Sequence, residues 1–220
     1  MSYLVGLAGS VAAGKSTLAA QLAEKEQALG KTVEVVSTDG FLLPNAELER
    51  RGLLARKGFP ESYDTAAFAA FLEALRTGEP AIVPLYSHQT YDIRPGEYRE
   101  VIGPDVVIIE GINALQPVFT QEKLDRKIYL HAEELDLFRW YRERLLQLRD
   151  TARTDPDSYF ERFLGFTEAQ WETRIKTIWE TVNLPNLREH ILPTRDLADQ
   201  VLVKGPDHVI MTQPSTCFLL

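Results

Sequence analysis

The run from Gly9 to Thr17 is the feature that most constrains this chain, because it contains the pattern G-x-x-x-x-G-K-[ST]. Its glycines let backbone amides converge on phosphate oxygens without a side-chain clash. The positive end of the following helix faces the anion, Lys15 adds a point charge, and the Ser16 hydroxyl suits Mg²⁺. The pattern predicts a loop for nucleotide phosphates, against the plainer alternative of a glycine-rich turn before a helix. The predicted nucleotide contacts in this loop are Gly9, Ser10, Val11, Ala12, Ala13, Gly14, Lys15, Ser16 and Thr17.

The residues on either side of this run favour a parallel α/β sheet. Tyr3 to Ala8 is short and apolar, as a buried strand is. Lys15 to Leu29 repeats apolar residues at helical spacing and is closed by Gly30, and Thr32 to Ser37 is a short β-branched strand. Strand, helix and strand in this order form a βαβ unit. We therefore predict an α/β, three-layer P-loop NTPase fold, with a mostly parallel central sheet and helices on both faces.

Periodicity and turn residues place the remaining elements. The expected helices are Asn45 to Arg51, Thr65 to Arg76, Leu135 to Asp150 and Thr167 to Thr181. The expected strands are Asp105 to Glu110, Arg126 to Leu130, Gln200 to Lys204 and Val209 to Thr212, the last two as a hairpin about Gly205-Pro206. Two extended segments, Ala81 to Tyr91 and Glu97 to Ile102, are expected around a turn at Arg94-Pro95-Gly96.

Composition excludes several classes of protein. The net charge of −8 argues against a general nucleic-acid binder, because phosphate backbones need clustered lysine and arginine. No apolar run approaches the length of a membrane helix, and the N-terminus lacks a signal-peptide layout. Cys217 is the one cysteine, so no internal disulfide can form and a reducing compartment is expected. These features predict a cytoplasmic protein with neither nucleic-acid nor membrane partners.

Two carboxylates follow predicted strands at the edge of the sheet that carries the phosphate loop. In an open parallel sheet, ligands bind beyond the carboxyl ends of the strands. Asp39 comes just after the second strand, and Glu110 ends the strand that begins at Asp105. We assign Asp39 as the base for a substrate hydroxyl, and Glu110 with Ser16 as the support for Mg²⁺. The alternatives are a turn aspartate for Asp39, and for Glu110 a carboxylate that only hydrogen-bonds the phosphate loop.

Several longer runs are not required by phosphate binding alone. They are Thr38-Asp39-Gly40-Phe41 with Pro44-Asn45, Arg56-Lys57-Gly58-Phe59-Pro60-Glu61-Ser62-Tyr63-Asp64, Tyr86-Ser87-His88 with Tyr91-Asp92, Ile109-Glu110-Gly111-Ile112-Asn113, Thr154-Asp155-Pro156-Asp157-Ser158-Tyr159-Phe160, and Asn183 with Ile191-Leu192-Pro193-Thr194-Arg195. Over nearly the whole chain, these runs resemble the bacterial type I pantothenate kinases. That family belongs to the wider group that includes uridine kinase and phosphoribulokinase. The phosphate loop alone indicates only the superfamily.

The resemblance implies that ATP, with Mg²⁺, phosphorylates the primary hydroxyl of pantothenate, the first step towards coenzyme A. We expect one P-loop kinase domain over residues 1–220, with substrate-binding and lid elements at about 40–100 and 135–185. The resemblance also implies a homodimer. Lys15, Asp39 and Arg144 are expected to carry the transfer. The implied substrate contacts are Tyr86, His88, Tyr141, Arg144, Tyr159, Phe160 and Asn183.

The residues alone leave several of these roles open. The helix face with Tyr141 and Arg144 fits either a pocket wall or a partly buried core face with a snorkelling arginine. His88 alone fits a turn histidine, and Asn183 fits a C-terminal helix cap. Arg195 fits a contact to the adenine side of the nucleotide, or an ion pair with Asp196 or Asp199. A further set of arginines fits either a lid over phosphates or a solvated helix face paired with Glu143 and Asp150. These arginines are Arg139, Arg142, Arg144, Arg149 and Arg153.

Three departures from the family pattern bear on function. The first strand begins at Tyr3, where family members carry a long preceding segment. Ala20 stands at the place of an arginine associated with coenzyme A binding, so we expect weak inhibition by coenzyme A. Leu148 and Arg153 stand where the family has aromatics, so tolerance for extended pantothenate amides should differ. The alternative functions are a related kinase for uridine or a sugar, and a nucleotide sensor without catalysis.

Overall fold

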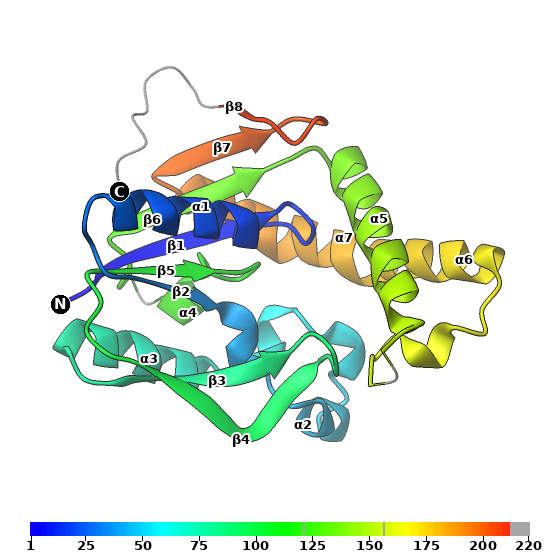
Figure 1. Cartoon of the computed structure of the whole chain (residues 1–220), viewed down its shortest axis with the longest axis horizontal. Helices are drawn as coiled ribbons and strands as arrows, with labels where there is room; N and C mark the ends of the chain where they lie inside the picture. Colours follow the sequence, from blue (N-terminus) through cyan, green and yellow to red (C-terminus); the bar gives the residue numbers. More distant parts are fainter. Residues whose placement is uncertain (121, 156, 212–220) are drawn as a thin grey trace.

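The computed structural model describes residues 1–120, 122–155 and 157–211. A six-stranded sheet in the order β2-β5-β1-β6-β7-β8 forms its centre (Figure 1). Its strands are β1 (Tyr3–Gly9), β2 (Val33–Ser37), β5 (Val106–Glu110), β6 (Arg126–His131), β7 (Gln200–Lys204) and β8 (Ile210–Met211). Every neighbouring pair is parallel except β7 and β8. The carboxyl ends of the parallel strands therefore meet at one edge.

Both faces of this sheet are covered, which explains why its strands read as continuous apolar runs. Every residue of β5 is buried, as is every residue of β1 except Tyr3. α1 (Lys15–Ala28) buries Leu18 and Leu22, as its helical spacing predicted. The other α-helices of the described residues are α2 (Asn45–Arg50), α3 (Thr65–Thr77), α4 (Pro117–Thr120), α5 (Glu134–Ala152), α6 (Glu168–Ile178) and α7 (Leu184–Asn186). The predicted three-layer P-loop NTPase fold is confirmed.

The antiparallel pair β3 (Ala81–Ser87) and β4 (Asp92–Val101) departs from the sequence prediction. The predicted turn at Arg94-Pro95-Gly96 is wrong: the chain reverses at residues 88–91, and β4 runs through that tripeptide. The register shifts here, because Pro84 pairs with Tyr98 whereas Tyr86 pairs with Ile93. The extra residues form an irregularity in β4, where a proline and a glycine with a φ of 73° are tolerated.

The C-terminal helices follow a longer path than the predicted helix Thr167 to Thr181. α6 begins at a capping box in which Thr167 and Gln170 each bond the other's backbone. Beyond Ile178 the chain stays helical through wide turns at Trp179–Asn183 and Leu187–Ile191. Asn183 therefore lies inside a helical segment and does not form a C-terminal cap.

The last strands confirm the predicted hairpin about Gly205-Pro206, since β7 and β8 pair antiparallel. β8 ends at Met211. Thr212, the tail Cys217 to Leu220 and Pro156 of the TDPDSYF run lie outside the described residues.

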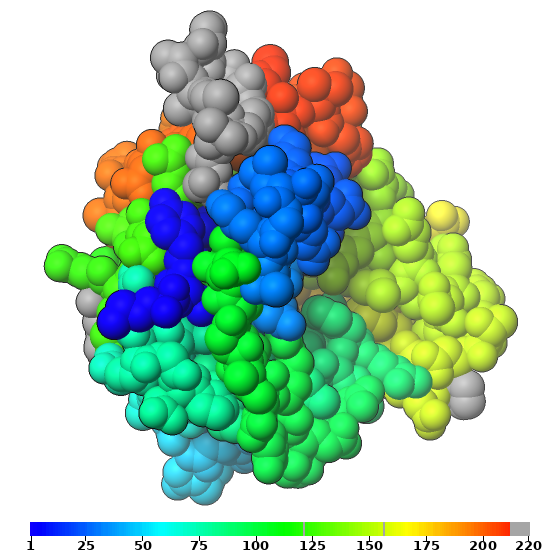
Figure 2. All heavy atoms as spheres, turned by 60° about the vertical axis from the view of Figure 1, so that its left-hand side comes forward, coloured from blue at the N-terminus to red at the C-terminus, as the bar shows by residue number. Residues whose placement is uncertain are grey.

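The connection between α1 and β2 is fastened to the segment that leads into β5. Thr32 N and Oγ1 donate to Asp105 Oδ2 at 2.7 and 2.8 Å. Figure 2 shows these two segments lying side by side on the surface. Within the described ranges, no helix is long and apolar enough to cross a membrane.

Candidate active site

The phosphate loop leaves β1 at Gly9 and enters α1 at Lys15. Gly9 approaches the neighbouring strand so closely that a Cβ there would lie 2.5 Å from Leu130 O. Ala12 and Gly14 have φ values of 62° and 93°, and such left-handed residues turn successive amides into an anion-binding concavity. Lys15 Nζ donates to Ser10 O at 2.9 Å, which folds this side chain back over the loop. The geometry suits the phosphates of a nucleotide.

Ionisable groups from adjacent strands meet at this sheet edge. Ser16 Oγ donates to Glu110 Oε1 at 3.0 Å. Burial lowers the pKa of Lys15, and the charges of Glu110 and Asp39 oppose that fall. Burial also raises the pKa of Asp39, and the negative charge of Glu110 adds to that rise. The strand order thus brings Lys15, Asp39 and Glu110 together.

Asp39 lies on a short 3-10 turn, Thr38–Phe41, that follows β2. The cap of this turn is Ser37, whose Oγ accepts from Asp39 N at 3.3 Å. No backbone amide of the described residues donates to the Asp39 carboxylate, so this side chain does not act as a turn aspartate. No side chain that the structure describes donates to this carboxylate either, so it can accept a hydrogen bond from a ligand.

The pair Ser16 and Glu110 has the donor chemistry for a Mg²⁺ ion that arrives with a nucleotide. Mg²⁺ prefers hard oxygen ligands and takes only one or two from the protein beside phosphates and water. A hydroxyl and a carboxylate 3.0 Å apart satisfy that requirement. Within the described part of the chain, no group of three or more His, Cys, Asp and Glu side chains forms a metal site by itself. The same contact also fits the alternative in which Glu110 only supports the loop.

Aromatic rings from the β3–β4 hairpin and the segment after α5 pack beside these charges. Tyr91 stacks on Tyr159 with ring centroids 5.0 Å apart, and Phe160 meets Tyr91 edge-on at 5.4 Å. Tyr86 meets His88 edge-on at 5.1 Å. Burial raises the pKa of Tyr86, and the Asp39 charge raises it further, which places this aromatic wall close to the carboxylate.

Arg144 is the arginine of α5 for which the described residues offer no carboxylate partner. The other three form ion pairs, Arg139 with Asp136, Arg142 with Glu172 and Arg149 with Asp150, and Arg153 just beyond the helix also pairs with Asp150. Among the described residues, Arg144 forms neither an ion pair nor a hydrogen bond, and it is exposed. Burial dominates the pKa shifts of Lys15 and Asp39, and the Arg144 charge lowers both values. Arg144 is therefore near the site and available for a phosphate, whereas the other arginines fit a paired helix face.

Tyr141 and Asn183 meet between α5 and the later helical segment. Burial raises the pKa of Tyr141 to about 12, and the nearby Asn183 side chain offsets part of that rise. Asn183 Nδ2 is buried and donates to no acceptor among the described residues. A buried donor without a partner is costly, so a ligand oxygen would stabilise it. The Tyr141 ring also packs against that of Trp179, with the ring centroids 5.6 Å apart, so this helix face forms part of the core as well.

Arg195 lies beside the carboxyl end of β6. Burial raises the pKa of Tyr129 to about 12, and the Arg195 charge opposes that rise. Burial lowers the pKa of His131, and the Arg195 charge adds to that fall. Within the described ranges Arg195 forms no ion pair with Asp196 or Asp199, so the ion-pair alternative is not found.

Two residues at the site were absent from the predicted set. Lys204 ends β7, and its Nζ donates to Ala13 O at 2.9 Å. Its position at the carboxyl end of a parallel strand was the sequence signal that could have placed Lys204 at the site. Tyr91 occurs in a run that resembles the family, but an aromatic in a turn gave no separate signal.

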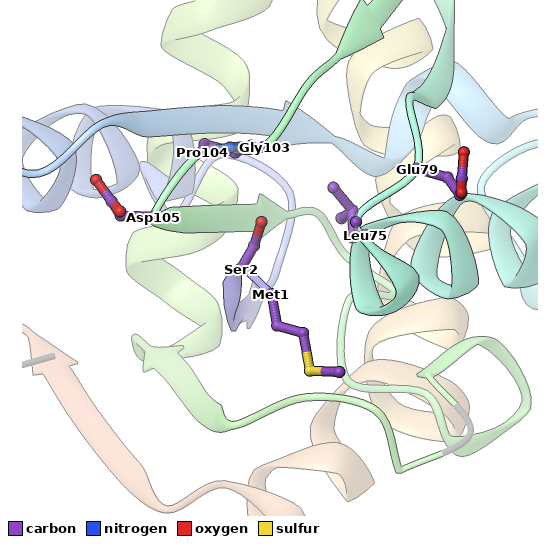
Figure 3. Close-up of a pocket in the computed structure, with 8 residues that line it drawn as sticks. Met1, Ser2, Leu75, Glu79, Gly103, Pro104 and Asp105 are labelled. Carbon is purple, nitrogen blue, oxygen red and sulfur yellow. The ribbon is translucent and has the colours of Figure 1, made fainter.

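The pocket in Figure 3, which Ser2, Leu75 and Pro104 help to line, lies at the amino ends of β1 and β5, away from this site.

Comparison with known proteins extends this picture. The model of the phosphoribulokinase / uridine kinase family matches residues 4–152. The pantothenate kinase of Rhizobium rhizogenes is 45% identical over 221 residues, which cover 94% of this chain and 67% of that protein. The pantothenate kinase of Sorangium cellulosum is 49% identical over 221 residues, which cover 94% of this chain and 70% of that protein.

One solved structure is also related in sequence. It is a protein from Silicibacter, provisionally assigned as a fructose transport system kinase, with 31% identity and a TM-score of 0.71. The match covers 91% of this chain and 89% of that one. The chain therefore belongs to the phosphoribulokinase / uridine kinase family of P-loop phosphotransferases and, within it, groups with the bacterial pantothenate kinases.

Proposed function

We propose that this chain transfers the γ-phosphoryl group of ATP to the primary hydroxyl of pantothenate. Relatives named pantothenate kinase, at 45% and 49% identity over most of the chain, support the choice of acceptor. The structural observation that carries the proposal is the meeting of Asp39 and Lys15 beside the unpaired Arg144. Pantothenate presents hydroxyls, an amide and a carboxylate, which call for a base, hydrogen-bond donors and an aromatic wall.

Asp39 is the proposed base. Its carboxylate accepts the hydroxyl proton as the substrate oxygen attacks the γ-phosphorus, and the bond to the β–γ bridging oxygen breaks to leave ADP. A base works best when its pKa lies near the working pH. The rise in the Asp39 pKa that burial causes moves it in that direction.

Charge neutralisation comes from side chains on both sides of the transferred group. Lys15 reaches it from the phosphate loop, and Arg144 reaches it from α5. Ser16 and Glu110 would hold Mg²⁺, which supplies further charge neutralisation when bound with ATP. The acceptor side is built from the regions at about 40–100 and 135–185, where Asn183 Nδ2 is a buried donor that a pantothenate oxygen would satisfy.

ADP release by the purified protein tests this function. The assay supplies Mg-ATP with pantothenate, uridine, fructose or no acceptor, and includes the Asp39→Asn variant. Turnover that depends on pantothenate and is lost in the variant is the expected result. Turnover with uridine alone or with fructose alone would instead indicate a related kinase that acts on that acceptor. Fructose is included because it occurs in the provisional assignment of the Silicibacter protein. ADP binding without turnover on any acceptor would favour a sensor.

A further inference from the structure

One carbonyl oxygen joins two segments of the candidate site. Gly58 O accepts a hydrogen bond from Asn113 Nδ2 and another from Asn186 Nδ2, both at 3.0 Å. Asn113 lies three residues beyond Glu110 in the sequence, and Asn186 lies three residues beyond Asn183. The end of β5 and the helical segment that carries Asn183 are therefore tied to the same atom.

The two amides have little freedom to turn elsewhere. A carbonyl oxygen only accepts, so each asparagine must direct its nitrogen at Gly58. Asn113 and Asn186 are 0% and 4% exposed. Within the described part of the chain, their Oδ1 atoms accept no hydrogen bond. The Gly58 carbonyl is therefore the acceptor that orients both amide nitrogens.

Gly58 itself is fixed by its own run. Its amide donates to Ser62 Oγ at 2.9 Å, and its φ of 96° is a conformation that suits glycine. Ser62 O accepts from Leu43 N at 2.9 Å. This bond ties the run to the segment that follows Asp39, so a third part of the site is held at the same place.

The residue before Gly58 reaches the aromatic wall. Lys57 Nζ donates to Tyr91 O and to Asn45 Oδ1, each at 2.6 Å. Tyr91 has a φ of 56°, a strained conformation for a bulky residue that persists only when its surroundings hold it. Lys57 is one of those supports.

We propose that Gly58, through Asn113 and Asn186, is a positioning element that fixes the acceptor contact Asn183 relative to the metal-binding carboxylate Glu110. This inference rests on the proposed function. It gives a role to the run Arg56 to Asp64, which phosphate binding does not require. The asparagines act through Glu110 and Asn183, and they need no contact of their own with ATP or acceptor.

Near-isosteric leucine substitutions test the positioning role. Asn113→Leu and Asn186→Leu each leave Gly58 O one donor, so we expect kcat with pantothenate to fall about 5-fold. The double variant leaves this oxygen without its amide donors, so the fall should reach about 100-fold, more than the product of the single effects. The KM for ATP should stay within about twofold of wild type, since neither asparagine bonds to the phosphate loop itself.

Gln116→Leu is the matched control. Gln116 Nε2 also donates to a backbone carbonyl across the same two segments, that of His190, but it does not involve Gly58. This variant should lose a similar amount of thermal stability and keep wild-type kinetics. If the double variant does not fold, the two single variants carry the test.

The outcomes separate the two proposals. Wild-type protein without pantothenate-dependent ADP release overturns the proposed function. An active wild type, together with folded asparagine variants that match it in kcat, overturns the positioning role alone. The positioning role is also overturned if Gln116→Leu loses as much kcat as the asparagine variants do. The same holds if the asparagine variants lose ATP affinity by as large a factor as kcat, because either result would indicate general loosening of the fold.

Discussion

Lys204 Nζ donates a hydrogen bond of 2.9 Å to Ala13 O, which joins the last residue of β7 to the phosphate loop across 191 positions of the sequence. The same ammonium lies 4.7 Å from the ring centroid of Trp140 on α5. A Cβ added to Gly14 would lie 2.7 Å from the Lys204 ammonium nitrogen. One cation thus connects the sheet, the loop and the helix that carries Arg144.

Replacement of this cation should weaken nucleotide binding. In Lys204→Met the loop loses a support and a nearby positive charge, so we expect the Kd for ADP to rise about tenfold, with a smaller effect on kcat. Calorimetric titration with ADP measures this change. Lys176→Met is the control, because that ammonium pairs with Glu180 at 3.8 Å on the exposed surface of α6. An unchanged Kd in Lys204→Met would contradict a role at the phosphates.

Asp39→Asn should lower kcat by about 10²–10⁴-fold, because the amide cannot accept the hydroxyl proton. Asp64→Asn is the matched control, since Asp64 caps α3 by accepting from Ala67 N at 2.9 Å and asparagine caps equally well. Turnover of Asp39→Asn close to that of wild type would mean that Asp39 is not the base.

The difference in stability between Asp39→Asn and the wild type should depend on pH in a defined direction. The pKa of Asp39 in the folded protein is raised above 3.8, chiefly by burial. Its contribution to stability is therefore fully present below pH 3.8 and is lost as the pH rises through the folded-state pKa. Asp39→Asn has no such loss, so its melting temperature relative to wild type should be higher at pH 8 than at pH 4. Melting curves at the two pH values check the sign, and the opposite order would show that the buried carboxylate is stabilised by its neighbours.

Much of the fold could be predicted from the sequence because its strongest elements are local. The apolar strands β1 and β5 and the glycine-rich run between β1 and α1 each carry their own signal. The carboxyl ends of parallel strands share an edge by geometry, so the meeting of Asp39 and Glu110 followed from their places after two strands.

Other features depend on contacts that no local pattern encodes. Pro95-Gly96 reads as a turn, yet the pairing of β3 with β4 absorbs it as an irregularity. Asn183 reads as a cap because Pro185 follows, but proline is tolerated in the first turn of the next helix. Arg142 pairs with Glu172, a carboxylate thirty residues away that no pattern within α5 announces.

Glu110→Gln should raise the Mg²⁺ concentration needed for half of the Mg²⁺-dependent melting shift with ADP about 10–100-fold, because a neutral amide is a poor ligand for a hard cation. Binding of ADP without Mg²⁺ should change little. Melting shifts with ADP across a Mg²⁺ titration measure both effects. An unchanged Mg²⁺ dependence would favour the alternative in which Glu110 only supports the loop through Ser16.

Gly111→Ala should destabilise the fold strongly. A Cβ at this position would lie 1.7 Å from Thr38 Oγ1, and the Thr38 side chain is buried next to Asp39. Overpacking of this kind costs about 1–3 kcal/mol, or more when the neighbour cannot move. Gly165→Ala is the control, since nothing lies within 4 Å of the added Cβ there. Equal melting temperatures for the two variants would show that Thr38 can move aside.

Ala20 lies four residues beyond Ser16, on the same exposed face of α1. The family resemblance implies an arginine at this position that is associated with coenzyme A binding, and a methyl group cannot bind a phosphate. We therefore expect coenzyme A to inhibit the wild type weakly, and Ala20→Arg to lower the inhibitory concentration about tenfold through a charge-assisted contact. Ala28→Arg, at the far end of the same exposed helix, controls for added charge. The assay is ADP release with coenzyme A titrated at two ATP concentrations, and strong competition with ATP in the wild type would contradict this role for position 20.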